Sequence, residues 1–212
     1  MSTFFTVVRH GETAANVNCV IQGQSDVPLS PTGEEQAKLL ARRWRSRRFD
    51  AVYSSDLSRA MRTAELIAPG MTPIPTPELR EMDLGAWVGH TTGEIAERFP
   101  EEWRAFRSCS VECRATGGES RRELLARITR FFRTAAARHE GQSVLVVTHG
   151  GALRAFFLML MGGSLNDGAL LPSTGNTGIS TVRYEAETGR WRLIAWNDTA
   201  HLESLTNGDD AY

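Results

Sequence analysis

Two His-Gly pairs in the chain each follow a run of apolar residues. His10 follows the run 4–8 and Arg9, and His149 follows the run 144–147 and Thr148. Short apolar runs rich in valine and phenylalanine predict buried strands. Ligands of open α/β sheets bind outside the carboxyl ends of the strands, so each pair points toward a pocket. If the two strands are neighbours, both imidazoles lie at one edge of one sheet.

Three further side chains complete a set that could transfer a phosphoryl group. Arg9 and Arg59 could hold a tetrahedral dianion by forked, charge-assisted hydrogen bonds. A neutral imidazole is a good nucleophile toward phosphorus, and a second, protonated imidazole could neutralise charge on the phosphoryl oxygens. A carboxyl group such as Glu81 could protonate the leaving alkoxide and later take a proton from water. This chemistry needs no metal ion.

Other interpretations of these residues stay open. Glu81 could be a structural acid paired with Arg80, and Asp83 is a rival proton donor. A zinc site formed by His10, His149 and Glu81 is conceivable, although the neighbouring arginines would repel a divalent cation.

The remaining histidines and the cysteines carry weaker signals. His90 either touches substrate or lies at the surface, His139 suits the C-terminal end of a helix, and His201 suits a structural role in the tail. Three cysteines, Cys19, Cys109 and Cys113, form neither a zinc-like pattern nor a disulfide framework. Cys109 and Cys113 could share a helix face, with no assigned role.

The elements that must position the site residues can be read along the chain. Residues 11–29 are polar and turn-rich, which predicts a long loop over the first strand end. A helix is expected to begin at Pro31, with Ser30 as its N-cap. A second strand over 50–55 leads into a helix that ends near Ala68, with Asp56 or Ser58 as its cap. Arg59 lies in the first turn of that helix, where an anion is favoured.

The second half of the chain predicts an insertion, two long helices and a hairpin. Residues 71–77 contain three prolines and suit an edge strand or a connector. Two short helices, one begun by a Thr91–Glu94 capping box and one following Pro100, lie in a segment, 85–119, that we interpret as a lid. An amphipathic helix should end near His139 and bury a stripe of six residues, Leu124, Leu125, Ile128, Phe131, Phe132 and Ala135. An apolar helix over 152–161, a hairpin of strands 179–185 and 190–196, and a loosely held tail should follow.

Composition limits the class of protein. The chain has 212 residues, 41% hydrophobic content and a net charge of −1. We expect one α/β domain over 1–212, with no nucleic-acid or membrane partner and a cytoplasmic location. A monomer or a homodimer is equally compatible with the sequence.

Six short motifs occur in one order along most of the chain. They are VVRHGET (7–13) with Asn16, QGQSDVPLSPTG (22–33), YSSDLSRAMRTAE (53–65), LREMDLGAWVG (79–89), GGES (117–120) and VVTHGG (146–151). In this combination the chain resembles the histidine phosphatase superfamily, most closely its phosphoglycerate mutase-like branch. The resemblance covers about residues 4–155. It implies a three-layer α/β fold, with a mostly parallel central sheet, helices on both faces and a small helical lid.

The resemblance also implies a role for each site residue. His10 would be the phosphohistidine nucleophile, Arg9, Arg59 and His149 would complete the phosphate pocket, and Glu81 would be the proton donor. The residues implied to line the substrate pocket are Thr13, Asn16, Gln22, Gly23 and the Gly150 backbone. No cofactor is implied for a phosphatase of this family.

The choice within the family rests on the length of the lid. Phosphoglycerate mutases of this family carry a longer insertion between the positions of Glu81 and His149, and this shorter version is similar to the broad phosphatases. We therefore hypothesise a metal-independent phosphatase acting on a small phosphorylated metabolite. A cofactor-dependent mutase remains an alternative, as does a fructose-2,6-bisphosphatase-like enzyme, to which the run 176–180 is weakly similar. A phosphate-binding protein without turnover is disfavoured by the complete set of acid, nucleophile and arginines.

Overall fold

A six-stranded sheet forms the centre of the molecule. The computed structural model describes residues 1–108, 111–162 and 174–206. In the described residues the strand order is β3-β2-β4-β1-β5-β6; β3, β2, β4 and β1 are parallel, β5 is antiparallel to β1, and β6 is antiparallel to β5. The strands are β1 (Ser2–Arg9), β2 (Ala51–Ser54), β3 (Ile74–Pro75), β4 (Ser143–Thr148), β5 (Ile179–Glu185) and β6 (Arg190–Asp198). The proline-rich segment therefore forms an edge strand, and the predicted hairpin of β5 and β6 is present.

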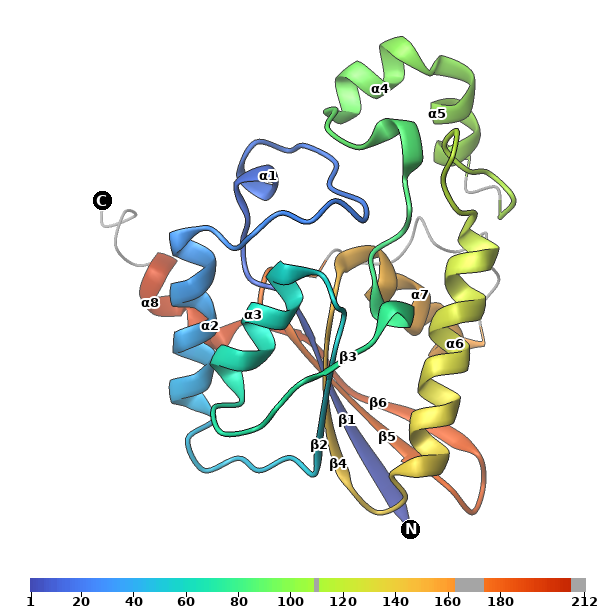
Figure 1. Cartoon of the computed structure of the whole chain (residues 1–212). Helices are drawn as coiled ribbons and strands as arrows, with labels where there is room; N and C mark the ends of the chain where they lie inside the picture. Colours follow the sequence, from blue (N-terminus) through green and yellow to red (C-terminus); the bar gives the residue numbers. More distant parts are fainter. Residues whose placement is uncertain (109–110, 163–173, 207–212) are drawn as a thin grey trace.

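Helices cover both faces of the sheet, as Figure 1 shows. On one face lie α2 (Pro31–Arg43) and α3 (Ser58–Ile67), and on the other α6 (Arg121–Arg138) and α7 (Gly150–Met161). Alternating residues of the strands enter the two cores: Val7 and Val146 pack with α6 and α7, whereas Val8 and Val147 pack with α2 and α3. The predicted stripe of α6 is buried, apart from Leu125, which is only partly buried. The predicted three-layer α/β fold is thus confirmed.

The starts of the helices test the local interpretation of the sequence. Ser30 caps α2, because its hydroxyl accepts the Gly33 N–H at 3.0 Å. The cap predicted for α3 is wrong: Leu57 is the N-cap and makes no side-chain bond. The Ser58 N–H instead donates to Asp26 Oδ1 at 2.7 Å, so a distant loop satisfies this helix end. Residues 14–17, predicted as loop, form a one-turn helix, α1 (Ala14–Val17).

The segment predicted as a lid lies above the carboxyl end of the sheet in Figure 1. It contains η2 (Gly85–Trp87), α4 (Thr92–Arg98) and α5 (Pro100–Arg107). A small core of its own, formed by Trp87, Ile95 and Ala115, supports it. The capping box of Thr91 with Glu94 is present. The role of this segment as a lid, and the single-domain organisation, stay predictions.

The last dozen residues, 201–212, were expected to be loosely held, and the described part of them forms regular structure. This part contains η4 (Ala200–Leu202) and α8 (Glu203–Thr206), whereas 207–212 lie outside the described residues. His201 is 9% exposed, and its Nε2 lies 2.8 Å from the Thr177 hydroxyl.

The short helix η1 (Pro77–Leu79) precedes the Glu81 segment. None of the described helices has the length and apolar character of a membrane span. Cys109 and most of the loop after α7 lie outside the described residues.

Candidate active site

The ends of β1 and β4 bring the two predicted histidines together. Arg9 pairs with Thr148 in the parallel register, so His10 and His149 are the next residues on neighbouring strands. Their imidazole rings lie 5.0 Å apart between centroids, inclined by 58°. Both are buried, at 2% and 0% exposure. The prediction that both imidazoles lie at one edge of the sheet depended on the two strands being neighbours, and β1 and β4 pair directly.

The hydrogen bond of His10 Nδ1 determines which ring nitrogen carries the proton. Its Nδ1 lies 2.7 Å from the Gly11 carbonyl oxygen, which can only accept, so Nδ1 carries the proton and donates. Burial, and then the Arg9 and Arg59 guanidinium groups, hold the pKa of His10 well below its ordinary value. The ring is therefore neutral near pH 7, with the lone pair on Nε2. Such a nitrogen has the form of a nucleophile.

The turn that provides this carbonyl is tightly packed. A Cβ on Gly11 would lie 2.6 Å from the Gly33 carbonyl oxygen, so only glycine fits. The Gly11 N–H donates to Thr63 Oγ1 at 3.0 Å, and this hydroxyl donates to the Arg59 carbonyl at 2.7 Å. Thr63 thus links the His10 turn to the helix that carries Arg59.

His149 has the reverse arrangement. Its Nε2 lies 2.8 Å from Ser55 Oγ, and Ser55 Oγ is also within reach of the Leu57 N–H at 3.4 Å. Ser55 Oγ accepts that N–H, and its own O–H has no acceptor other than Nε2 among the described residues, so the O–H donates to Nε2 and the ring proton lies on Nδ1. Burial and nearby cationic groups hold the pKa of His149 well below its ordinary value. The sequence reasoning missed Ser55, although it follows β2, the strand beside β4.

The two predicted arginines, Arg59 buried and Arg9 partly buried, both donate to backbone carbonyls. Arg9 donates to the Thr174 carbonyl at 2.5 Å. Arg59 is 1% exposed and donates to the Ser25 and Gly23 carbonyls at 2.7 and 2.9 Å. Each guanidinium thus has its orientation fixed by backbone carbonyls, that of Arg9 by the segment before β5 and that of Arg59 by the loop after β1.

Three buried donors of this site have no partner among the described residues. They are Arg9 Nε, Arg59 Nε and His149 Nδ1. An unpaired buried donor costs about 1–3 kcal/mol, so several in one place call for a ligand. Donors from two guanidinium groups and an imidazole fit an anion with several oxygens, such as a phosphate. His10 is close enough to both arginines for their charges to lower its pKa, and its ring lies 5.0 Å from that of His149, so these donors surround the same region of the site.

Glu81 lies at the same edge of the sheet, at the start of α7. Its carboxylate accepts the Gly151 N–H at 3.0 Å and the Met82 N–H at 2.8 Å. A Cβ on Gly150 would lie 3.6 Å from Arg9 Nε and 3.9 Å from Glu81 Oε2, so Gly150 separates the acid from the arginine. The N-terminus of α7 adds a partial positive charge here.

The alternatives to Glu81 have other partners. Arg80 forms a forked pair with Asp56, at 2.7 and 2.5 Å, rather than with Glu81. Asp83 Oδ1 accepts the Gly85 N–H at 3.0 Å, at the base of the lid segment. These contacts leave Glu81 as the acid beside the arginines.

Except for Gly150, which begins α7, the predicted substrate-binding residues lie in the loop region after β1, where hydrogen bonds link several of them. The Thr13 hydroxyl lies 3.0 Å from both Asn16 Oδ1 and Gln22 Oε1. The Gly23 backbone is in the left-handed region, at φ 51°, and its carbonyl holds Arg59. Asn176, which the sequence reasoning used only as a family similarity, donates to the His10 carbonyl at 3.0 Å and to Asn16 Oδ1 at 3.3 Å.

The other histidines lie outside this cluster. His90 is in the lid segment, where Nδ1 donates to the Val88 carbonyl at 3.2 Å and Nε2 contacts Arg98. His139 is the C-cap of α6, as expected, and bonds Tyr53 and Gln142. In the described part of the chain, no three His, Cys, Asp or Glu side chains are grouped so that they could hold a metal ion. Cys19 and Cys113 are free thiols.

Two hollows on the surface lie away from the site. One, of about 320 Å³, borders the edge strand β3 and α6, and the other, of about 490 Å³, lies beside Trp44 and Phe49. Neither is lined by His10, His149 or Glu81.

The family model of the histidine phosphatase superfamily (branch 1) matches residues 5–199. The chain belongs to this superfamily. The predicted family and the predicted enzyme class, a histidine phosphatase, are thereby confirmed.

Individual relatives place this histidine phosphatase among phosphatases and mutase-like proteins. It is 38% identical to the metal-independent phosphoserine phosphatase of Arabidopsis thaliana, over 96% of this chain and 84% of that protein. It is 35% identical to phosphoglycerate mutase-like protein 4 of the same plant, over 93% and 86%. A phosphoserine phosphatase variant from Entamoeba histolytica, solved with phosphoserine, superposes with a TM-score of 0.86 at 29% identity, over 94% and 99%.

Proposed function

We propose that this histidine phosphatase hydrolyses small phosphomonoesters, without a metal ion, through a phosphohistidine on Nε2 of His10. The observation that carries the proposal is the set of unpartnered donors, Arg9 Nε, Arg59 Nε and His149 Nδ1, beside a neutral imidazole. The donors would hold the phosphoryl oxygens, and charge neutralisation with positioning is most of what phosphoryl transfer requires.

In the first step, the Nε2 lone pair of His10 attacks phosphorus. The P–O ester bond breaks, its electron pair goes to the leaving oxygen, and the Glu81 carboxyl group gives its proton to that oxygen. The products are an alcohol and phospho-His10, with Glu81 as carboxylate. Arg9, Arg59 and His149 donate hydrogen bonds to the oxygens of the phosphoryl group throughout.

In the second step, Glu81 takes a proton from water as the water oxygen attacks phosphorus. The P–Nε2 bond breaks and its electron pair returns to His10. Inorganic phosphate leaves, and the imidazole and the acid regain their starting forms. Glu81 therefore acts first as acid and then as base at one position.

Phosphoserine is the first substrate we propose. The support is that relatives named as phosphoserine phosphatases match nearly the whole chain, both in sequence and in structure. The mutase alternative is supported by a relative named as mutase-like, and it would need a second phosphoryl group to remain bound while it reorients. We further propose a cytoplasmic location and, because a net charge of −1 gives no argument for nucleic acid or an anionic membrane surface, no nucleic-acid or membrane partner.

The test is a phosphate-release assay in excess chelator with phosphoserine and with 3-phosphoglycerate as substrates. We expect phosphate from phosphoserine with full activity in chelator, and no transfer of phosphate between positions of 3-phosphoglycerate. His10→Ala should abolish release. His139→Ala, a matched histidine at the opposite end of the sheet, should retain it. Loss of activity in chelator, or release that survives in His10→Ala, would contradict the proposal.

A further inference from the structure

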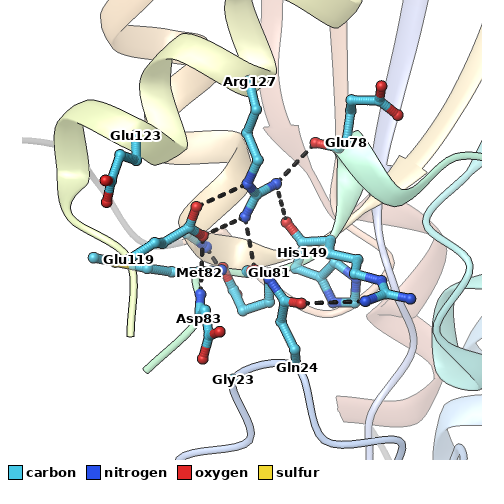
Figure 2. Close-up of polar contacts among 12 residues, drawn as sticks. Gly23, Gln24, Glu78, Glu81, Met82, Asp83, Glu119, Glu123, Arg127 and His149 are labelled. Atoms are coloured by element: carbon cyan, nitrogen blue, oxygen red, sulfur yellow. Dashed lines mark hydrogen bonds and ion pairs between the residues drawn. The ribbon is translucent and has the colours of Figure 1, made fainter. Parts of the chain in front are cut away.

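The guanidinium of Arg127, on α6, directs three of its five N–H groups to backbone carbonyls of residues 78–81 and the other two to the Glu119 carboxylate. It donates to the Glu78 and Arg80 carbonyls at 2.8 and 2.7 Å and to the Glu81 carbonyl at 2.8 Å. The other two bonds go to both carboxylate oxygens of Glu119, at 3.0 and 2.5 Å. Figure 2 shows the arginine at the centre of this cluster. An arginine has five donors in a fixed fork, so none is left over.

These contacts hold a backbone that has no regular structure of its own. Residues 80–84 belong to neither a helix nor a strand. The Glu81 carbonyl is held from two sides, by Arg127 and by Gln24 Nε2 at 3.1 Å. The side chain of Glu81 leaves this backbone toward the N-terminus of α7. A shift of the Glu81 backbone would therefore move the carboxyl group relative to the phosphate donors.

The partner of Arg127 closes the base of the lid segment. Glu119 Oε1 accepts the Asp83 N–H at 2.9 Å, and the Glu119 N–H donates to the Asp83 carbonyl at 2.9 Å. The segment leaves and rejoins the domain between these two residues. The Arg127–Glu119 pair is largely buried, with side-chain exposures of 14% and 16%. The same ion pair thus fixes the acid and the point where the lid segment begins.

We propose that Arg127, with Glu119, is a positioning residue that holds Glu81 in place for proton transfer to the leaving group. This inference rests on the proposed function, because it assigns a support to the proposed acid. Arg127 does not touch the phosphate in this role. It keeps the acid fixed beside the N-terminus of α7, next to the phosphate donors.

A misplaced acid has a kinetic signature that simple loss of structure lacks. Phosphoserine leaves an alkoxide that needs a proton, whereas p-nitrophenyl phosphate leaves a stable phenolate that does not. kcat/KM reports the step in which the leaving group departs. Damage to the acid therefore lowers kcat/KM for phosphoserine selectively, while damage to the whole site lowers both values together.

The experiment compares Arg127→Lys with Arg133→Lys, an exposed arginine on the same helix. Arg127→Lys keeps the charge but loses the fork, and we expect its kcat/KM to fall by about 10- to 100-fold for phosphoserine. The fall for p-nitrophenyl phosphate should be below about threefold. Arg133→Lys should leave both unchanged. Glu119→Gln, which keeps an acceptor for Asp83, provides a second variant and should shift the ratio in the same direction by about threefold or more.

A double-mutant cycle separates positioning from a general structural role. In a Glu81→Gln background, which has no acid to position, Arg127→Lys should cost less than about twofold for phosphoserine. An equal loss on both substrates, or a cost that persists at about tenfold in the Glu81→Gln background, would overturn the inference. Failure of the proposed function looks different: the wild-type protein would then hydrolyse neither substrate in chelator.

Discussion

The ends of β1 and β4 carry the same His-Gly pair at the same level of the sheet, yet they present different nitrogen atoms. At β1, His10 donates from Nδ1 to the Gly11 carbonyl at 2.7 Å, which leaves Nε2 with the lone pair. At β4, His149 meets the Ser55 hydroxyl through Nε2 at 2.8 Å, which leaves Nδ1 as an unpartnered donor. One imidazole is thus prepared to attack, and the other to donate a hydrogen bond.

The difference arises from the backbone that continues each strand. After β1 the chain turns into a loop, and the Gly11 carbonyl is free to face the His10 ring. After β4 the chain enters α7 at once, with His149 as the N-cap. The carbonyl of a first-turn residue is committed to the helix, so the His149 ring takes its partner from the neighbouring strand instead. Identical dipeptides therefore acquire opposite roles from their backbone context.

The largest expected effect is at the β1 end. His10→Ala removes the proposed nucleophile, and we expect kcat for phosphoserine to fall by about 10³-fold or more. No phosphoenzyme should form in this variant. Steady-state kinetics in chelator provide the measurement. A fall no larger than that of His149→Ala would remove the distinction between the two strand ends.

His149→Ala should cost less, about 10²- to 10³-fold in kcat, because it removes one donor to the phosphoryl oxygens rather than the attacking atom. The variant should still form phospho-His10, only slowly. Rapid-quench experiments with labelled substrate measure that rate. Complete absence of the phosphoenzyme in His149→Ala would mean that His149 takes part in the attack.

A smaller effect is expected at Ser55, which sets the tautomer of His149. Ser55→Ala should lower kcat by about tenfold, because the hydrogen bond that holds the ring proton on Nδ1 is lost. Ser55→Thr keeps the hydroxyl and is the matched control. When His149 is already alanine, removal of the Ser55 hydroxyl should have little further effect. A full cost in that background would assign Ser55 a role independent of His149.

The smallest predicted effect is on the pH dependence of the free energy of unfolding, to which His10 and His149 should contribute alike. The pKa values of His10 and His149 lie well below 6.5 in the folded chain, whereas the unfolded chain takes up these protons near pH 6.5. The unfolded state therefore binds more protons in that window, and the free energy of unfolding falls as pH drops below about 6.5. Above that pH this contribution to stability is complete.

Urea unfolding at pH 7.5, 6.0 and 5.0, in phosphate-free buffer, checks this pH dependence. The fall in stability should be smaller in His10→Asn and in His149→Asn, by similar amounts. His201, whose pKa burial lowers to about 4, should contribute in the same direction. A variant with an unchanged slope would show that its histidine is not buried as the neutral form.

Much of this site was predictable because it lies at strand ends. His10, His149 and Arg59 each follow a strand by a few residues, and the parallel register brings them together. Glu81 lies beyond the short edge strand β3 and the helix η1, and it was predicted from the family resemblance as much as from its chemistry. The family's motifs also placed Asn16, Gln22 and Gly23 in the loop that faces the site.

The features that sequence reasoning missed depend on contacts between distant segments. Leu57 is the N-cap of α3, and the first N–H of this helix, that of Ser58, donates to Asp26, which lies 32 positions earlier in the chain. In the sequence, Ser55 is only the end of a predicted strand, and its contact with His149 becomes evident only when β4 is known to lie beside β2. In the sequence, Arg127 is one of several arginines on its helix, and only the tertiary structure shows that its guanidinium donates to three backbone carbonyls. Local pattern carries no information about such partners.

The most direct test of the account is the site of phosphorylation. The protein is mixed with phosphoserine in chelator, quenched in alkali, and the phosphohistidine is assigned by peptide mass spectrometry and by ³¹P NMR. The account predicts phosphate on Nε2 of His10, formed as fast as turnover and absent from His10→Ala. Phosphate on Nδ1 or on His149, or turnover with no phosphoenzyme at all, would contradict it.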